Sequence, residues 1–189
     1  MIVYLASQSP RRKEILTRMG IPFRVVRSRY VENALGNVPK CKPRELVLRH
    51  AIEKARQAKL PKRARYVLGA DTVVWIGGHA LGKPRSKTEA IRMLRMISGR
   101  KHQVFSAMAL WDRKKNQMWA GCERTDVWVK SLGLKEIQRY LLQIHAYDKA
   151  GAYAIQCRPK IVKKIRGSYS NVVGFPRQLF RKILGQAGF

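Results

Sequence analysis

Acidic residues are scarce in this chain, and it has no long apolar run. Asp and Glu number 11 among 189 residues, against 40 Lys and Arg, which gives a formal net charge of +29. The longest stretches without a charged side chain, 72–82 and 167–176, fall short of the roughly 20 apolar residues that a membrane helix needs. We therefore expect no membrane partner, and the apolar fraction of 46% predicts a packed core rather than a disordered basic tail.

Cysteine is equally sparse, and its spacing excludes two structural classes. The three cysteines, Cys41, Cys122 and Cys157, are odd in number and far apart, and no two of them form a C-x-x-C pair. A disulfide framework and a zinc ribbon both need closely spaced, paired cysteines. The first residues also lack the basic leader and the apolar segment of a secretory signal. These features predict a protein of the reducing cytoplasm.

The excess of basic residues admits two interpretations. A pI of about 11.0 is typical of proteins that bind nucleic acid. The alternative is a solvated cationic surface around a cleft that binds a small anion. Lys and Arg are spread along the whole chain rather than gathered in a tail or one block, which favours the second interpretation without excluding the first.

Apolar periodicity and turn residues predict interleaved strands and helices. Strands are expected at 2–6, 23–26, 66–76, 79–81, 103–111, 118–129, 152–156 and 160–165. Helices are expected at 10–19, 43–59, 86–98, 134–143 and 176–184. This order predicts an α/β fold, and the hairpin from 103 to 129 predicts a mixed, twisted sheet. One domain is expected over residues 1–189.

The few acids can be considered one by one. Most of them fit helix surfaces, a cap or a turn, and Glu123 and Asp126 fit exposed positions on a strand. Three remain, at Glu32, Asp71 and Asp148. Asp71 lies inside an apolar predicted strand, where a carboxylate is costly unless it is paired or binds a cation. Asp71 is therefore a candidate for chemistry, and the alternative is a structural Asp satisfied by a backbone turn or a buried Arg.

Three other segments suit either an anion or a plain connection. Residues 7–12 (Ser-Gln-Ser-Pro-Arg-Arg) lie where the first strand leads into the first helix, so free N–H groups, two hydroxyls and two guanidiniums come together. Gly82-Lys83-Pro84 holds a lysine before a fixed backbone position. Residues 167–176 are rich in turn formers and lead into the last helix. The plainer alternatives are an ordinary N-cap, a solvated lysine and a connecting loop.

Together and in this order, the segments resemble the Maf (septum-formation) family of nucleoside triphosphate pyrophosphatases. The matching pieces are 5–12 (LASQSPRR), 69–74 (GADTVV), 81–84 (LGKP), 93–100, 148–156 and 167–176. They extend over essentially the whole chain. The ordered set is far more specific than any one piece.

The resemblance implies a fold, a reaction and a site. The fold is like that of the inosine triphosphate pyrophosphatases, a mixed sheet with flanking helices and two lobes around a cleft. The reaction is hydrolysis of a nucleoside triphosphate to monophosphate and pyrophosphate with a divalent metal, Mg²⁺ or Mn²⁺, and the family suggests a homodimer. By position, Asp71 is the proton acceptor and shares the metal with Glu32. The triphosphate cradle comprises Ser7, Arg12, Lys54 and Lys83.

Three further positions resemble the subgroup of dTTP/UTP pyrophosphatases, namely Arg11, Thr72 and Gln156. A Gln amide can accept from N3–H and donate to O4 of uracil or thymine as one bidentate pair. The resemblance therefore implies that these residues set the specificity, with dTTP and UTP, and modified pyrimidine nucleotides beside them, as substrates.

The chain departs from the family pattern at several points. Val31 stands where the first of two acids is usual, so Glu32 remains alone, and Cys157 replaces a glycine before an altered segment, 158–160. His50 replaces an apolar residue on the second helix, and we interpret it as structural. The loss of one carboxylate and the charge of +29 leave an alternative function open, a basic nucleic-acid-binding protein on a Maf-like scaffold with weakened catalysis.

Overall fold

The computed structural model describes residues 2–31 and 42–189. Its strands are β1 (Val3–Ala6), β2 (Phe23–Val25), β3 (Tyr66–Ile76), β4 (His79–Leu81), β5 (Lys101–Asp112), β6 (Gln117–Val129) and β7 (Val162–Arg166). Its helices are α1 (Pro10–Arg18), α2 (Pro43–Arg56), α3 (Lys87–Ile97), α4 (Leu134–Gln143), α5 (Tyr169–Val173) and α6 (Arg177–Gln186), with the 3₁₀ turns η2 (Ala146–Asp148) and η3 (Ala150–Ala152). Among these helices, none combines the length and apolar character needed to cross a bilayer.

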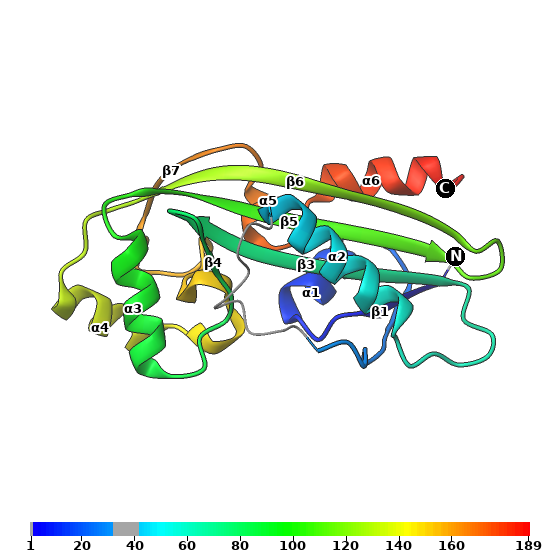
Figure 1. Ribbon diagram of the computed structural model, residues 1–189, viewed down its shortest axis with the longest axis horizontal. Helices are drawn as coiled ribbons and strands as arrows, with labels where there is room; N and C mark the ends of the chain where they lie inside the picture. Colours follow the sequence, from blue (N-terminus) through cyan, green and yellow to red (C-terminus); the bar gives the residue numbers. More distant parts are fainter. Residues whose placement is uncertain (1, 32–41) are drawn as a thin grey trace.

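Three long strands, β3, β5 and β6, run along the molecule (Figure 1). Across the sheet the order is β2-β1-β3-β5-β6-β7, and β4 pairs with the end of β3. β1 is parallel to β2 and β3, whereas the pairs from β3 to β7 are antiparallel, so the predicted mixed sheet is confirmed. Ala6 at the end of β1 pairs with Gly69, which brings the residues after β1 beside the middle of β3.

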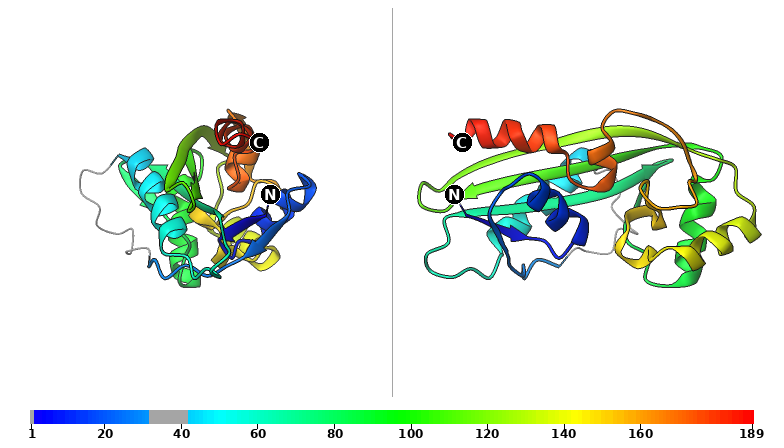
Figure 2. Two further views of the ribbon diagram at one scale, coloured as in Figure 1. Left: turned by 90° about the vertical axis from the view of Figure 1, so that its right-hand side faces the viewer. Right: turned by 180° about the vertical axis from the view of Figure 1, so that it is seen from behind.

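Helices cover the sheet on both faces and divide the molecule into two lobes. α2 lies on one face of the half that contains β1, and α1 and α6 lie on the other (Figure 2). Apolar cores there include Val47 and Phe105 on the α2 side, and Leu16 and Phe180 on the opposite side. α3, α4 and the η turns pack at the other end of the long strands, around a core that contains Leu94. The expected flanking helices and two lobes are confirmed.

Small residues let α2 lie close against β3. A Cβ atom on Gly69 would overlap the backbone oxygen of Ala51 and come within 2.9 Å of the Ala55 nitrogen. Ala51 and Ala55 are fully buried, so the helix and the strand touch along their backbones. Position 71 lies on the same face of β3 as Gly69, because side chains two residues apart in a strand point the same way. The close approach therefore brings α2 side chains within reach of Asp71.

One expectation about the second half of the chain is wrong, and one alternative left open there is decided. Residues 152–156 do not form a strand, because Gly151 and Ala152 have φ values of 69° and 61°, in the left-handed region. The apolar residues that suggested a strand are buried without strand pairing. Residues 167–176 hold the short helix α5 rather than a plain loop. Ser168 caps this helix by accepting from the Asn171 N–H, and Gly174 ends it at φ 100°.

The expectation that Asp126 is exposed is also wrong. Asp126 is 2% exposed, and Arg166 of β7 donates to it at 2.9 Å. The two residues are directly opposite each other in the β6–β7 ladder, where unlike charges stabilise strand pairing. The sequence pattern of β6 alone does not show that β7 pairs with it and places Arg166 beside Asp126.

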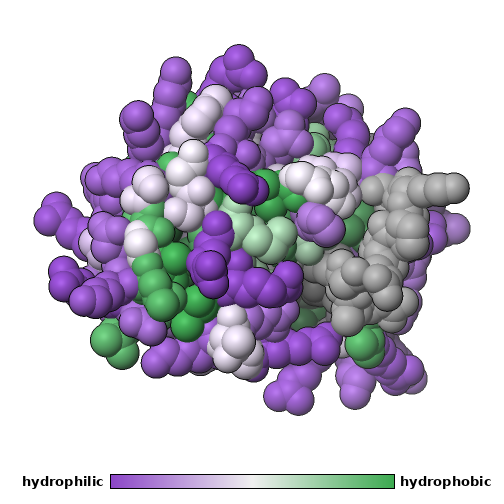
Figure 3. Space-filling view, turned by 60° about the vertical axis from the view of Figure 1, so that its left-hand side comes forward, coloured by the Kyte–Doolittle hydropathy of each residue, from purple (hydrophilic) through white to green (hydrophobic). Residues whose placement is uncertain are grey.

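Basic side chains are spread over the surface rather than collected on one side. Figure 3 shows hydrophilic side chains over much of one face, with apolar side chains in smaller areas among them. Exposed arginines occur in both lobes, for example Arg18 on α1 and Arg95 on α3. This distribution agrees with the even spread of Lys and Arg along the sequence.

Candidate active site

A cavity of about 360 Å³ lies between the two lobes. Its lining includes eight of the site residues expected from the sequence, namely Ser7, Arg11, Arg12, Lys54, Asp71, Thr72, Lys83 and Gln156. Glu32, the other expected metal ligand, lies outside the described residues. Small-molecule sites typically enclose roughly 300–1,000 Å³, so this cavity has the size of a ligand site.

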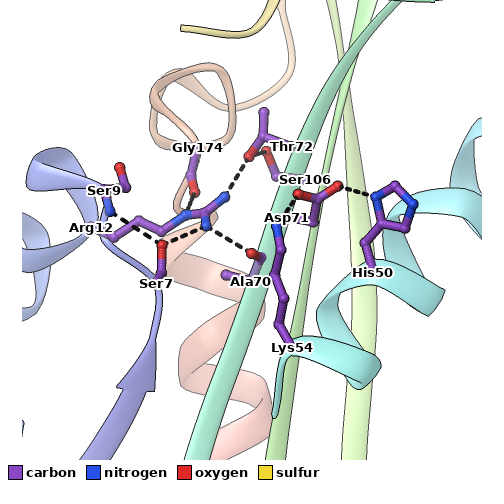
Figure 4. Close-up of polar contacts among 10 residues, drawn as sticks. All are labelled: Ser7, Ser9, Arg12, His50, Lys54, Ala70, Asp71, Thr72, Ser106 and Gly174. Carbon is purple, nitrogen blue, oxygen red and sulfur yellow. Dashed lines mark hydrogen bonds and ion pairs between the residues drawn. The ribbon is translucent and has the colours of Figure 1, made fainter. Parts of the chain in front are cut away.

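Asp71 lies at the wall of the cavity, on the side of β3 that faces α2 (Figure 4). Both of its carboxylate oxygens are engaged: Lys54 Nζ lies 2.6 Å from Oδ1, and His50 Nδ1 lies 3.0 Å from Oδ2. His50 and Lys54 are four residues apart on α2, so they project from one face of the helix toward the strand. The contact of His50 with Asp71 is one that the sequence did not suggest.

The surroundings of Asp71 determine its protonation state. Burial by itself would raise the pKa of Asp71, but the charge of Lys54 and the hydrogen bond from His50 outweigh it and hold that pKa far below its usual value. Asp71 is therefore ionised at neutral pH and can only accept hydrogen bonds. It follows that the His50 nitrogen facing Asp71 carries a hydrogen and acts as the donor.

Arg12 is buried and bonds to protein acceptors on several sides of the cavity. Its guanidinium donates to Ser7 Oγ at 2.9 Å and to the backbone oxygens of Ala70 and Gly174 at 2.7 and 3.0 Å. Its Nη2 donates to Thr72 Oγ1 at 3.1 Å. These bonds join α1 to β3 and to the turn after α5 (Figure 4). Arg12 therefore fixes the shape of the cavity wall and places a positive charge there.

Thr72 extends this network into the sheet. Ser106 Oγ donates to the carbonyl oxygen of Asn171 at 2.9 Å, so its single hydrogen is engaged there. The Thr72 hydroxyl, 3.0 Å from Ser106 Oγ, must then be the donor in that pair, while it accepts from Arg12. Sequence analysis missed Ser106 and Asn171. The available signal was a lone hydroxyl in the apolar part of β5.

Arg11 is paired with Asp148 of the second lobe. Its Nη1 lies 2.7 Å from Oδ2 of Asp148, and its Nη2 donates to the Asp148 backbone oxygen at 2.8 Å. Lys149 donates to Oδ1 at 2.6 Å. Burial would raise the pKa of Asp148, but Lys149 and Arg11 together hold it below its usual value. This cluster ties α1 to η2 across the cavity.

The second lobe also contributes Lys83 and Gln156. Lys83 follows β4, and the carbonyl oxygen of its neighbour Gly82 accepts from the Gly151 N–H at 2.9 Å, which holds the loop against η3. Gln156 follows η3, in the irregular segment that replaces the expected strand. Because Lys83 and Lys54 line the same cavity from different lobes, a polyanion between the lobes would meet a cation on each side.

The described residues of this site fit a divalent cation only if a bound ligand supplies some of its ligands. Among residues 2–31 and 42–189, no three His, Cys, Asp or Glu side chains come close enough together to hold a metal by themselves. Asp71 offers an ionised carboxylate at the cavity wall, and Mg²⁺ is commonly bound by one or two carboxylates with substrate phosphates and water. The residues present therefore fit a metal that binds together with a phosphorylated ligand, and they do not form a complete protein cage.

The mixed sheet and the cation-lined cavity between its lobes place this chain among α/β proteins that bind phosphorylated small molecules. The fold is the inosine triphosphate pyrophosphatase-like fold expected from the sequence. It matches the Staphylococcus aureus Ham1 protein with a TM-score of 0.52 at 12% identity, over 99% of this chain and 100% of that one. The chain belongs to the Maf family, since the model of the Maf-like protein family matches residues 2–187.

Relatives with assigned activities are similar over nearly the whole chain. A dTTP/UTP pyrophosphatase of Dictyoglomus thermophilum is 38% identical over 188 residues, 99% of this chain and 96% of its own length. One of Geobacter sp. strain M21 is 43% identical over 175 residues, 92% of this chain and 89% of its own. One of Methanosarcina barkeri is 38% identical over 188 residues, 98% and 94% of the two chains. The family expected from the ordered motifs is confirmed.

Proposed function

We propose that this protein is a nucleoside triphosphate pyrophosphatase that hydrolyses dTTP and UTP to the monophosphate and pyrophosphate. The observation that carries this proposal is the cavity in which an ionised carboxylate, Asp71, lies among cations from both lobes. Hydrolysis of a triphosphate needs its charge neutralised and a water molecule oriented, and this lining suits both tasks. The names of the relatives, dTTP/UTP pyrophosphatase, support the substrate.

Lys54 and Asp71 form the centre of the proposed mechanism. Lys54 Nζ donates to Oδ1 of Asp71 at 2.6 Å. A triphosphate entering the cavity competes for this ammonium group, because Lys54 itself lines the cavity. As Lys54 turns toward the phosphates, Oδ1 of Asp71 loses its hydrogen-bond donor, and a lone pair of that oxygen becomes available to water. Oδ1 is then able to accept a proton from water.

The proposed reaction is an in-line displacement at the α-phosphorus. The water oxygen forms a bond to phosphorus, the bond from phosphorus to the bridging oxygen breaks, and pyrophosphate leaves with that electron pair. The water proton passes to Asp71, while Ser7, Arg12, Lys54 and Lys83 hold the phosphates. A divalent cation, Mg²⁺ or Mn²⁺, held by Asp71 and Glu32 together with the phosphates, would supply charge neutralisation and a more acidic water.

Gln156 is the proposed reader of the base, with Arg11 and Thr72 shaping the pocket. Thr72 is fixed by Arg12 and Ser106, and Arg11 is fixed by Asp148, so both are held in place before substrate binds. The Gln156 amide lines the same cavity and can match N3–H and O4 of a uracil or thymine ring.

A panel of nucleotides tests the proposed substrate. The purified protein is incubated with dTTP, UTP, CTP, ATP and GTP in Mg²⁺ or Mn²⁺, and the release of pyrophosphate is measured for each. We expect dTTP and UTP to be hydrolysed fastest, with dTMP and UMP as the other products. Equal rates on all five would contradict the base preference, and release of orthophosphate in place of pyrophosphate would contradict the reaction.

A second candidate, nucleic-acid binding, is favoured by one specific feature of the sheet. Half-buried Trp128 of β6 has Lys101 and Lys164 within 5.9 and 5.6 Å of its ring, and both lysines are exposed. The three residues are neighbours across β5, β6 and β7. Aromatic rings flanked by cations are a common platform for single-stranded nucleic acid. If the protein binds nucleic acid at Trp128, replacing Lys101 and Lys164 weakens that binding far more than replacing two distant lysines.

We also propose a cytoplasmic location and a homodimeric state for the protein. Cys122 and Cys157 are free thiols in the part of the chain that the structure describes, which supports a reducing, cytoplasmic location. The family resemblance supports a homodimer. Sedimentation equilibrium of the purified chain tests the dimer, and cell fractionation tests the location.

A further inference from the structure

We propose that His50 is a positioning residue that fixes the carboxylate of Asp71 for catalysis. The proposal rests on the proposed pyrophosphatase function and goes beyond it, because it assigns a role to a residue that the family pattern replaces with an apolar one. Its evidence is the contact between His50 Nδ1 and Asp71 Oδ2, at 3.0 Å, at a position that is 2% exposed.

Three features hold His50 in this place. The backbone contact of α2 with Gly69 sets the height of the helix over β3, and Asp71 is two residues further along that strand. The ring of Tyr30 packs against the His50 ring on another side, with centroids 5.6 Å apart. Burial of the ring leaves little room for another rotamer. His50 is therefore a fixed donor, whereas a donor on a surface side chain would be mobile.

The two partners of Asp71 differ in their access to substrate. Lys54 lines the cavity, so that phosphate oxygens can reach it, whereas His50 lies behind Asp71 and outside the lining. A bound triphosphate draws Lys54 away from Oδ1 and leaves the His50 bond to Oδ2 in place. Without that bond the carboxylate could rotate about its terminal torsion, which is a soft one. His50 thus keeps Oδ1 directed at the cavity, where the phosphates and water would lie.

Two substitutions at the same site test this role. His50→Leu keeps the apolar bulk and removes the donor, whereas His50→Asn places an amide nitrogen on Cγ, as Nδ1 is in histidine, and restores a donor. For His50→Leu we expect kcat on dTTP to fall roughly tenfold or more, because a hydrogen bond to a charged group is lost in the reacting state. KM should change less than about threefold, since His50 does not touch the substrate. His50→Asn should recover most of the lost kcat.

Controls separate positioning from folding. Arg49→Leu alters the neighbouring exposed position on α2 and should leave kcat unchanged. Melting temperature, and the shift of that temperature by dTTP without metal, are measured for every variant. We expect the melting temperature to fall in His50→Leu and to recover in His50→Asn, because a buried carboxylate oxygen loses and regains its donor, and the shift by dTTP to stay near wild type in both. Wild-type kcat in His50→Leu would overturn the role of His50 and leave the proposed function intact. Equal loss in the Leu and Asn variants, together with lowered melting temperature, would reduce His50 to a structural residue. A wild type that hydrolyses no nucleotide would instead overturn the proposed function itself.

Discussion

The two carboxylates of this site, Asp71 and Asp148, are each paired with basic side chains of the protein. Asp71 is held by Lys54 and His50, and Asp148 is held by Arg11 and Lys149. Burying the unpaired charge of Asp71 would cost several kcal/mol, so its two partners make this buried carboxylate tolerable. Arg11 and Asp148 are only partly buried, and their pairing contributes less. A phosphorylated substrate then binds by exchanging partners with charges that are already in place, and the exchange at Lys54 is what would prepare Asp71 for chemistry.

Gln156→Glu tests how the base is read. The substitution replaces the amide donor with an acceptor, which would face O4 of the pyrimidine with no hydrogen between them. An unsatisfied buried contact of this kind costs about 1–3 kcal/mol. The value of kcat/KM for dTTP and UTP should therefore fall roughly tenfold or more. The same constant measured with a GTP analogue should fall less or rise, because a guanine edge presents two donors. An equal proportional drop on all three substrates would show that Gln156 supports the fold or the phosphates instead.

Residue chemistry could be predicted from the sequence only where a residue is unusual in its local setting. Asp71 is such a residue, a carboxylate inside an apolar strand. Other residues of the cavity lining, such as Lys54, Thr72 and Gln156, were expected only from the family resemblance. His50 carries no such mark, and the lone hydroxyl of Ser106 in an apolar strand does not reveal which residue it contacts. Their partners are 21 and 65 residues away, and those contacts depend on how α2 and α5 pack on the sheet.

The contact between α2 and β3 is the element-level feature on which the site depends. It sets the distance from His50 and Lys54 to Asp71, and Gly69 permits it. Because the opposing atoms at Gly69 belong to the backbone of a helix, they cannot yield by a rotamer change as a flexible side chain could. The geometry of the site is therefore coupled to the stability of this helix–strand contact.

Gly69→Ala tests that coupling. The added methyl group would push α2 away from β3, and overpacking of this kind typically costs about 1–3 kcal/mol of unfolding free energy. We expect a lower melting temperature, and hydrolysis lowered further than the remaining folded fraction explains, because Lys54 and His50 move away from Asp71. Gly185→Ala on α6 is the matched control. Its methyl group meets no atom within 4 Å, so it should leave activity unchanged. If Gly69→Ala were as harmless as Gly185→Ala, the close packing of α2 would not matter to the site.

Helices and strands could be predicted from the sequence where the apolar pattern is long and regular. The long strands β3, β5 and β6 and the Ser86 N-cap of α3 follow from apolar runs and turn residues, and the structure has them within a few residues of the expected bounds. The other half of the expected capping box is wrong, because the Glu89 carboxylate accepts from the Arg85 N–H rather than from that of Ser86. A strand was wrongly predicted at 152–156, because an irregular segment buried in the core of the second lobe has the same apolar run as a strand. α5 is too short for periodicity to reveal, and its Ser168 cap also fits an ordinary turn.

At the level of the whole molecule, the charge of +29 is distributed over both lobes. A surface of this kind attracts polyanions through counterion release whatever their sequence. It also raises the local concentration of nucleotides near the cavity. We therefore expect nucleic-acid binding to follow from the overall charge, and specific binding at Trp128, Lys101 and Lys164 is the alternative.

Binding to DNA or RNA should be measurable at low salt and fall steeply as salt rises. A labelled oligonucleotide titrated at several ionic strengths gives the slope of affinity against salt. The double variant Lys101→Gln/Lys164→Gln is compared with Lys114→Gln/Lys115→Gln, which removes the same charge from the exposed turn between β5 and β6. Similar small losses in both are expected. Affinity that stays flat with salt would contradict a charge effect, and a loss confined to the first pair would place the binding at Trp128.

The most direct test of the account is the release of pyrophosphate from dTTP by wild type and Asp71→Asn, measured side by side. An amide has nearly the shape of the carboxylate but cannot take a proton from water, and general-base contributions are typically about 10²–10⁴-fold. We expect wild type to yield dTMP and pyrophosphate, and Asp71→Asn to bind dTTP with similar affinity but to release almost no pyrophosphate. Retention of more than roughly a tenth of wild-type turnover by Asp71→Asn would contradict the role given to this carboxylate, since it lies well above the smallest loss expected.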